Sequence, residues 1–103
     1  MAQTVIRKPD RFEISVDEDV AGFAQFIDRD GQRIFFHTEI DPQFGGRGLA
    51  GIVVGHALDA TREDGLRAVP VCPFVKKYVE RHSDYADIVD PVTPAALAAV
   101  PRG

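Results

Sequence analysis

The sequence lacks several features that would place it in a specialised class of proteins. It has a single cysteine, Cys72, so it cannot form an internal disulfide, and we expect a reducing compartment. Its formal net charge is −4, unlike the basic composition typical of nucleic-acid-binding proteins. No apolar run approaches the ~20 residues that span a bilayer, and the first residues do not resemble a signal peptide. We therefore expect a cytoplasmic protein without nucleic-acid or membrane partners.

The composition is that of a folded chain. Hydrophobic residues make up 45% and charged residues 27% of the 103 residues, which argues against disorder. Because this length suits one domain, we expect a single domain over residues 1–103, with a core from about 4 to 90 and a C-terminal tail from 91 to 103. The three histidines and the cysteine lack the spacing of a zinc site, so no metal site is predicted.

The first third of the chain is predicted to be an antiparallel meander. Phe12, Ile14 and Val16 alternate with polar residues, which is the period of a strand with one buried face. Further strands are predicted over residues 4–8, 20–28 and 33–40, with a hairpin turn at Asp30-Gly31. Gly22, inside one of these strands, indicates either a β-bulge or the close approach of another backbone.

The rest of the chain is mainly helical in its periodicity. A helix is predicted over residues 47–63, with an apolar face made of Leu49, Ile52, Val53, His56, Ala57 and Ala60. Gly51 and Gly55 each disfavour this helix by roughly 1 kcal/mol relative to alanine, which suggests that the helix packs closely on a sheet. A buried strand (66–72), a shorter helix (74–82) and a last helical stretch (94–100) follow. This order predicts an α+β fold, a mostly antiparallel sheet covered by helices.

A glycine-rich loop joins the strand ending at Ile40 to the long helix. The first N–H groups of a helix have no partners within it, and with the helix dipole they attract anions. Glycines let a backbone come close to a phosphate, so Gly45, Gly46 and Gly48 suggest a pyrophosphate site. The spacing fits neither a Walker loop nor a Rossmann fingerprint. Taken alone, such a loop is more often an ordinary flexible connection before a helix.

The segment Gly45-Gly46-Arg47-Gly48-Leu49-Ala50 resembles the acyl-CoA loop of the GNAT superfamily of N-acyltransferases, written Gln/Arg-x-x-Gly-x-Gly/Ala. Gly48 and Ala50 match the glycine and the small residue, whereas Gly45 stands where the family has Gln or Arg. Blocks 37–40, 70–75 and 81–85 further resemble a family of very short GNAT-like proteins, so that the resemblance covers about residues 12–89.

The resemblance implies a minimal GNAT-like fold with a long helix after the glycine-rich loop and a shorter C-terminal helix. It also implies that acetyl-CoA, as co-substrate, binds in a V-shaped opening between the strand ending at Ile40 and the strand ending near Cys72. The loop amides would hold the pyrophosphate, and Arg81 would reach the adenosine phosphate, although a solvated helix end is the alternative for Arg81. The predicted cofactor-binding residues are Ile40, Gly45, Gly46, Arg47, Gly48, Leu49, Ala50 and Arg81.

The candidate catalytic residues are Cys72, His37 and Glu39. Cys72 lies at a predicted strand-to-helix junction, where a thiol can become a better nucleophile; the alternative is a small buried hydrophobe. His37 and Glu39 lie two residues apart on a strand, so they share a face and could act as a base. The alternative for this pair is a solvent-facing strand surface. Tyr78 and Tyr85 are interpreted as packing residues.

Two functions from different classes remain open. The first is acetyl-CoA-dependent N-acetyltransfer to an amine, either a small molecule such as a polyamine or a protein lysine. The alternative is a non-catalytic module that binds CoA or another protein, which the small size favours because few residues remain for an acceptor pocket. Fold alone does not choose between the two. In either case we expect a monomer or a weak homodimer.

Overall fold

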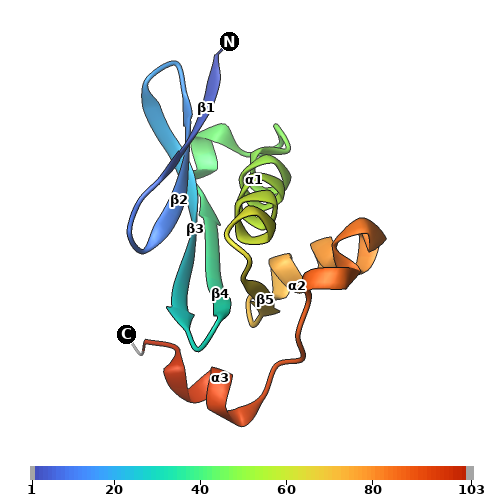
Figure 1. Ribbon diagram of the computed structural model, residues 1–103. Helices are drawn as coiled ribbons and strands as arrows, with labels where there is room; N and C mark the ends of the chain where they lie inside the picture. Colours follow the sequence, from blue (N-terminus) through green and yellow to red (C-terminus); the bar gives the residue numbers. More distant parts are fainter. Residues whose placement is uncertain (1, 102–103) are drawn as a thin grey trace.

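The computed structural model describes residues 2–101, which form a five-stranded sheet with helices against it (Figure 1). The strands lie in sequence order and are β1 (Gln3–Arg7), β2 (Arg11–Val16), β3 (Asp19–Arg29), β4 (Gln32–Ile40) and β5 (Arg67–Pro70). The helices are α1 (Leu49–Glu63), α2 (Pro73–Arg81) and α3 (Pro94–Ala99), with 3-10 turns at Pro42–Phe44 and Ser83–Ile88. The first four strands pair antiparallel, and β4 pairs with β5 in parallel. The predicted α+β fold class is therefore confirmed.

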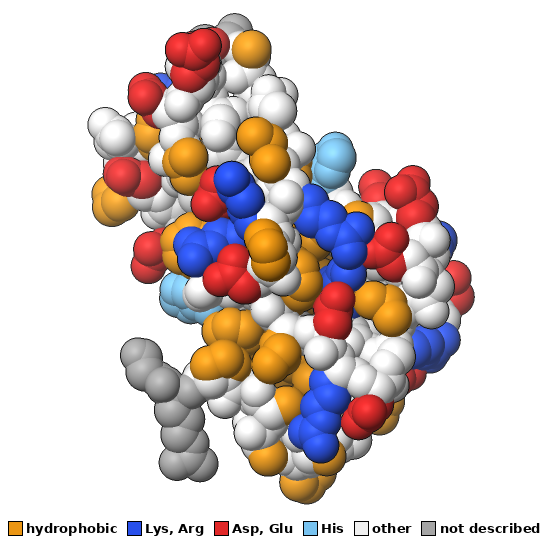
Figure 2. Space-filling view, turned by 60° about the vertical axis from the view of Figure 1, so that its left-hand side comes forward, with side chains coloured by type: hydrophobic (Ala, Val, Ile, Leu, Met, Phe, Trp, Pro, Cys, Tyr) orange, Lys and Arg blue, Asp and Glu red, His pale blue; other side chains and the backbone are white. Residues whose placement is uncertain are grey.

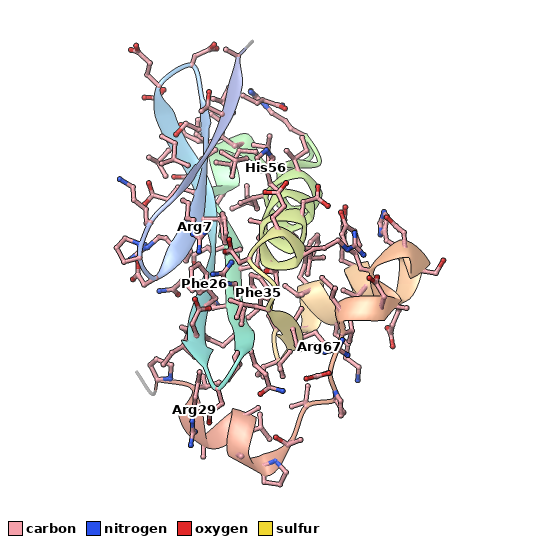
Figure 3. All side chains as sticks on the ribbon, in the orientation of Figure 1. Arg7, Phe26, Arg29, Phe35, His56 and Arg67 are labelled. Carbon is pink, nitrogen blue, oxygen red and sulfur yellow. The ribbon has the colours of Figure 1, made fainter. Side chains whose placement is uncertain are left out.

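The main core lies between the sheet and α1. As predicted, alternate residues of β2 are buried, and the ring of Phe12 lies 5.3 Å from that of Phe26 on β3. Phe26 in turn lies 6.1 Å from Phe35 on β4, edge to face, and both rings project toward α1 (Figure 3). A smaller cluster of Ile34, Val69 and Ala96 joins α3 to the opposite face of the sheet.

The buried face of α1 differs from the predicted one. Ile52 is 39% exposed and His56 is exposed, whereas Val54, Leu58 and Thr61 are buried with Leu49, Val53, Gly55 and Ala57. The prediction was wrong for Ile52 and His56 because the helix is rotated toward residues 54, 58 and 61. This rotation leaves the side of α1 that bears Ile52 and His56 open.

Gly51 and Gly55 serve helix–helix packing, not the helix–sheet packing suggested by the sequence. A Cβ on Gly55 would lie 2.7 Å from the Tyr78 hydroxyl of α2, and a Cβ on Gly51 would lie 3.7 Å from the same ring. The absence of a side chain at Gly55 therefore allows Tyr78 to lie directly on α1.

Two β-bulges determine which side chains face α1. The β2–β3 register passes from Ile14↔Gly22 to Ser15↔Val20, which leaves Ala21 as an extra residue. A Cβ on Gly22 would collide with the Glu39 carbonyl and Ile40, so both the bulge and the close approach expected there are present.

The second bulge is at Phe36, because the register passes from Phe26↔Phe35 to Gln25↔His37. Side chains alternate along a strand, so Gln25 points away from the face that carries Phe26. His37 lies opposite Gln25 and therefore also points away from α1. Without the bulge, His37 would share the core-facing side of Phe35.

Candidate functional site

β4 and β5 are neighbours that diverge before β4 ends. Their parallel register ends at Phe35↔Pro70, and the Cys72 N–H donates a final hydrogen bond of 2.8 Å to the Phe35 carbonyl. β4 then continues to Ile40, whereas the chain after Cys72 turns into α2. Residues 36–40 of β4 thus lie beyond the paired segment. Their backbone groups on the β5 side form a strand edge that an extended ligand could pair with.

The loop after β4 connects the strand to α1 and leaves its own backbone exposed. The Asp41 carboxylate accepts a 3.1 Å hydrogen bond from the Gln43 N–H and caps the 3-10 turn, whose Phe44 is buried. Gly46 and Gly48 have φ values of +79° and +71°, and a Cβ on either would meet open space. Only glycine adopts these φ values readily.

Gly48 is the N-cap of α1 and has no side chain with which to cap the first turn. The N–H groups of that turn are therefore not covered by their own N-cap, and the positive end of the helix dipole lies at the loop. The guanidinium of Arg47 lies 5.4 Å from the centre of the Phe44 ring. Arg47 thereby places a second positive charge beside the start of α1.

The predicted cofactor-binding residues lie in or next to this loop, except Arg81. Ile40 ends β4, residues 45–48 are exposed, and Ala50 is half-buried in the first turn of α1. Leu49 is only 2% exposed and packs into the main core. Arg81 lies apart from the loop in sequence, at the exposed end of α2.

Cys72 lies at the point where β4 and β5 diverge, as the N-cap of α2. The thiol is 4% exposed and donates to the Thr38 hydroxyl of β4, with Sγ and Oγ1 3.4 Å apart. The predicted strand-to-helix junction is present. Thr38 was not among the predicted site residues. Because side chains alternate along a strand, its position between His37 and Glu39 indicates that it points to the opposite face of β4 from that pair.

His37 and Glu39 form a pair, as predicted, but on the other face of the sheet. Their Nε2 and Oε1 atoms are 3.6 Å apart, and both side chains are about half exposed or more, at 49% and 62%. The His37 ring lies 5.8 Å from Phe23, which also faces away from α1. Since Thr38 alternates with them, the structure brings His37 and Glu39 together and places them across β4 from Cys72.

A groove between α1 and α2 extends from the glycine-rich loop. Its volume is about 570 Å³, and it is lined by Gly48, Gly51, Ile52, Gly55, His56, Asp59, Tyr78, His82 and Tyr85. The rings of Tyr78 and His82 are stacked with centroids 3.9 Å apart, and the Tyr85 hydroxyl donates to Asp59 over 2.7 Å. Burial raises the pKa of both tyrosines, so both remain protonated near neutral pH. These contacts support the packing role expected for the two tyrosines.

Comparison with known proteins identifies the family. A profile of the GCN5-related N-acetyl-transferase family matches residues 11–88, which include β2 to β5, the glycine-rich loop and α2. The chain belongs to this family. As a family member it is an acetyltransferase, and the resemblance inferred from the sequence is confirmed. Comparison with curated protein sequences gave no significant match.

Two solved structures share the fold. A GCN5-like candidate N-acetyltransferase from Staphylococcus aureus, solved by NMR, is similar with a TM-score of 0.68 and 20% identity, over 88% of this chain and 91% of that one. A candidate GNAT-family acetyltransferase from Desulfovibrio desulfuricans is similar with a TM-score of 0.53 and 18% identity, over 70% of this chain. The match spans 52% of the Desulfovibrio chain. At these identities the two structures support the fold alone.

Within residues 2–101, no helix is long and apolar enough to cross a membrane. Nor does this part contain a group of three or more His, Cys, Asp or Glu side chains that could hold a metal ion.

Proposed function

We propose that this protein transfers an acetyl group from acetyl-CoA to an amine. The observation that carries the proposal is the early divergence of β4 from β5, directly followed along the chain by the glycine-rich loop and the start of α1. An extended, amide-containing chain ending in a pyrophosphate has the shape and charge that this arrangement would bind. The free edge of β4 suits the amides, and the start of α1 suits the phosphates.

The loop residues would act through their backbone. The positive φ values of Gly46 and Gly48 and the open space above them let an anion approach the N–H groups closely. Arg47 would add its charge to this site. A side-chain role at Gly45, where the family pattern has Gln or Arg, is absent, so the backbone amides carry the binding. Leu49 is buried in the main core and would anchor the end of the loop there.

Cys72 is positioned to accept the acetyl group transiently. Cys72 lies where the strands diverge, as the N-cap of α2, and a cysteine thiolate is a nucleophile. The thiolate would attack the thioester carbonyl and release CoA as a thiolate. The amine would then attack the new thioester, and Cys72 would leave as a thiolate. In the direct alternative, the amine attacks acetyl-CoA itself, and Cys72 only packs against Thr38.

His37 and Glu39 would serve the amine on the other face of the sheet. An amine must lose its proton to become a nucleophile, and an imidazole paired with a carboxylate can accept that proton. Because this pair lies across β4 from Cys72, the amine would reach the thioester through the opening between β4 and β5.

The proposal is tested by measuring free CoA thiol released from acetyl-CoA in the presence of a panel of amines. Amine-dependent release by the wild type, lost in a Glu39→Gln His37→Gln double variant, is expected. Acetyl-CoA binding without release for any amine would instead favour the alternative, a non-catalytic CoA-binding module. Absence of acetyl-CoA binding would rule out both and leave a protein-interaction role.

A further inference from the structure

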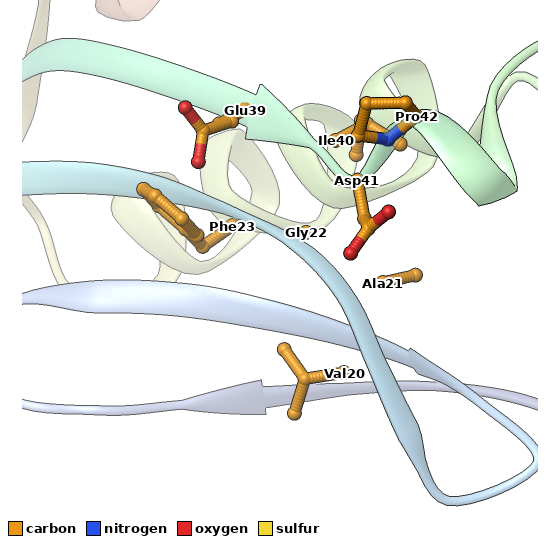
Figure 4. A pocket seen from close by; sticks show the side chains of 8 residues that line it. All are labelled: Val20, Ala21, Gly22, Phe23, Glu39, Ile40, Asp41 and Pro42. Atoms are coloured by element: carbon orange, nitrogen blue, oxygen red, sulfur yellow. The ribbon is translucent and has the colours of Figure 1, made fainter.

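A concavity lies at the end of β4, separate from the groove between the helices. Its volume is about 360 Å³, and it is lined by Val20, Ala21, Gly22, Phe23, Glu39, Ile40, Asp41 and Pro42 (Figure 4). We call it the bulge pocket. The side chains of Phe23 and Glu39 face away from α1, as His37 does, because Phe23 pairs with Glu39 across β3 and β4.

The backbone explains why the sheet is hollow at this point. The β-bulge at Ala21 bends β3, and such bulges commonly lie beside functional sites. Gly22 lets β3 approach the Glu39 carbonyl and Ile40 closely, and the Asp41 N–H donates to the Ala21 carbonyl over 2.7 Å, which fixes the end of β4 against the bulge. Val20 and Phe23 form apolar walls, and Val20 is 53% exposed.

The charged residues that line the bulge pocket are the carboxylates of Glu39 and Asp41; the Arg11 guanidinium, which lies 5.1 Å from the centre of the Phe23 ring, is paired with Asp10. Asp41 uses Oδ1 to cap the following turn, and its carboxylate also lines the pocket. Glu39 contacts His37, with Oε1 3.6 Å from Nε2. The acidic turn of residues 17–19 directly precedes Val20 along the chain, and acidic side chains gather at that end of the molecule (Figure 2). An apolar wall between carboxylates suits an alkyl chain that carries ammonium groups.

Resting on the proposed function, we propose that the bulge pocket selects a short aliphatic diamine as the acetyl acceptor. Asp41 binds the ammonium that does not react, Val20 and Phe23 contact the alkyl chain, and the other amine lies at Glu39. Glu39 and Asp41 are two residues apart in extended chain, which corresponds to about 6.6 Å. A diamine with a four-carbon chain spans a similar length. A volume of about 360 Å³ suits a small ligand.

This arrangement also places the reacting amine correctly. Glu39 follows Thr38, whose hydroxyl contacts Cys72 on the other side of β4. The amine at Glu39 is thus one residue along the strand from the position proposed for the acetyl group, on the opposite face, and would reach it through the opening between β4 and β5. The ammonium at Asp41 lies farther along the chain, away from the reacting centre, where it can stay protonated.

The test is an NMR titration of the ¹⁵N-labelled protein with 1,4-diaminobutane, with butylamine as the probe that lacks the second ammonium. The central variant is Asp41→Asn, because asparagine also caps a helical turn and removes only the charge. Asp17→Asn is the matched control, since Asp17 has a φ of +48° that asparagine tolerates and lies outside the pocket lining. Val20→Lys places a competing ammonium in the pocket.

We expect 1,4-diaminobutane to shift amide signals of residues 20–23 and 39–41 and to bind more tightly than butylamine. Asp41→Asn should weaken diamine binding by about fivefold or more, equivalent to about 1 kcal/mol. Asp17→Asn should change it by less than about twofold, and Val20→Lys should abolish it. Equal diamine affinity in the wild type and Asp41→Asn, or signal changes confined to other residues, would overturn the proposal.

The outcome also separates this inference from the proposed function. If CoA release occurs but the KM for 1,4-diaminobutane is the same with Asp41 or Asn, the function stands and the role of the bulge pocket is wrong. If the diamine binds as expected but no amine ever releases CoA, the cation site is supported and the transferase function is wrong. A rise in KM for the diamine alone, with kcat nearly unchanged in Asp41→Asn, supports both.

Discussion

At the scale of single residues, Cys72 distinguishes the two proposed routes of acetyl transfer. Its sulfur contacts Thr38 where β4 and β5 diverge, so it can meet a thioester lying in that divergence. The same contact buries it, as expected of a cysteine that only packs. The geometry therefore gives Cys72 a position suited to a nucleophile, and acetylation of its sulfur is what distinguishes a nucleophile from a packing residue.

Incubation with acetyl-CoA should add one acetyl group to the wild-type chain, at Cys72. We expect this because the sulfur lies at the start of α2 and beside the proposed thioester site. Intact-mass spectrometry after rapid acid quenching, with peptide mapping, measures it. Cys72→Ala should show no added mass and should lose amine-dependent CoA release. A Cys72→Ala protein that releases CoA at the wild-type rate would establish direct transfer instead.

Arg33 is a residue whose role only the structure reveals. Its side chain is 1% exposed, donates to Asp28 over 2.8 and 2.9 Å and lies 3.1 Å from the Asp64 carboxylate. Its guanidinium also lies 4.7 Å from the Phe26 ring centre. A buried charge of this kind is normally paired and hydrogen-bonded, and Arg33 joins the β3–β4 hairpin to the end of α1.

Arg33→Ala should lower the free energy of unfolding by about 2–4 kcal/mol, because it leaves a void and removes the partner of two carboxylates. Urea denaturation measures this loss. Arg29→Ala is the control, since Arg29 forms an ion pair with Asp30 in which both side chains are exposed, and its loss should cost about 0–1 kcal/mol. Equal effects of the two substitutions would contradict a structural role for the buried ion pair.

At the scale of elements, α1 serves three neighbours at once. It covers the sheet with Val53, Val54 and Leu58, begins at the glycine-rich loop, and accepts Tyr78 of α2 on its glycine side. Glycine lowers helix stability, and the close contact with α2 explains why Gly51 and Gly55 are present. The distance from an added Cβ to Tyr78 is shorter at Gly55 than at Gly51, so alanine substitutions at the two positions can be compared.

Gly51→Ala should stabilise the protein by about 0.5–1 kcal/mol, because the new Cβ meets Tyr78 at an ordinary contact distance of 3.7 Å. In Gly55→Ala the new Cβ would lie 2.7 Å from the Tyr78 hydroxyl, so the ring must move and the gain in helix propensity should be lost. Thermal unfolding of both variants tests this. If Gly55→Ala proves as stable as Gly51→Ala, the α1–α2 contact is looser than described.

The elements were more predictable from the sequence than the directions of their side chains. Alternation located β2, and the helices predicted over residues 74–82 and 94–100 correspond to α2 and α3. Helical periodicity located α1 but not its buried face, because Ile52 and His56 fit the apolar pattern and the helix still rotates them outward. The bulge at Phe36 likewise left no sequence signal, since it depends on pairing with β3.

The candidate site was predictable only in part for the same reason. The glycine-rich loop and Cys72 are local features, and the structure places them at the ends of neighbouring segments as the sequence indicated. Which face His37 takes depends on the bulge, and the Thr38–Cys72 contact joins residues distant in the sequence. The bulge pocket arises from Ala21 and Gly22 packing against the end of β4. Gly22 indicated the bulge or close approach, but not which residues lie opposite it.

At the scale of the whole molecule, hydrogen bonds from donor side chains to two carboxylates, Asp64 and Asp90, connect segments that are distant in the sequence. The hydrogen bond from Arg7 holds the pKa of Asp64 below its ordinary value of 3.8, with Arg33 contributing. Hydrogen bonds from Gln32 and Arg67 do the same for Asp90. A lowered pKa in the folded state means that the ionised form stabilises the fold.

The stability contributed by Asp64 and Asp90 should therefore be fully present above about pH 5. It should be lost as the pH decreases through 3.8 and below, where the two carboxylates become protonated. The Asp64→Asn Asp90→Asn double variant should be less stable than the wild type at pH 7 and should lose less stability between pH 5 and 3. Urea denaturation across this range measures both. A double variant whose stability falls as steeply as the wild type would assign the acid sensitivity to other groups.

The central claim for the whole molecule is that acetyl-CoA binds across the divergence of β4 and β5, with its pyrophosphate at the start of α1. Calorimetric titration with acetyl-CoA of the wild type, Gly48→Glu and Gly31→Glu tests it most directly. Gly31, in the β3–β4 turn, has a φ of +77° and open space for a side chain, as Gly48 does, so both substitutions impose the same backbone strain. We predict binding by the wild type and Gly31→Glu, and its loss in Gly48→Glu, where a carboxylate would repel the pyrophosphate. Equal binding by all three proteins would contradict the claim.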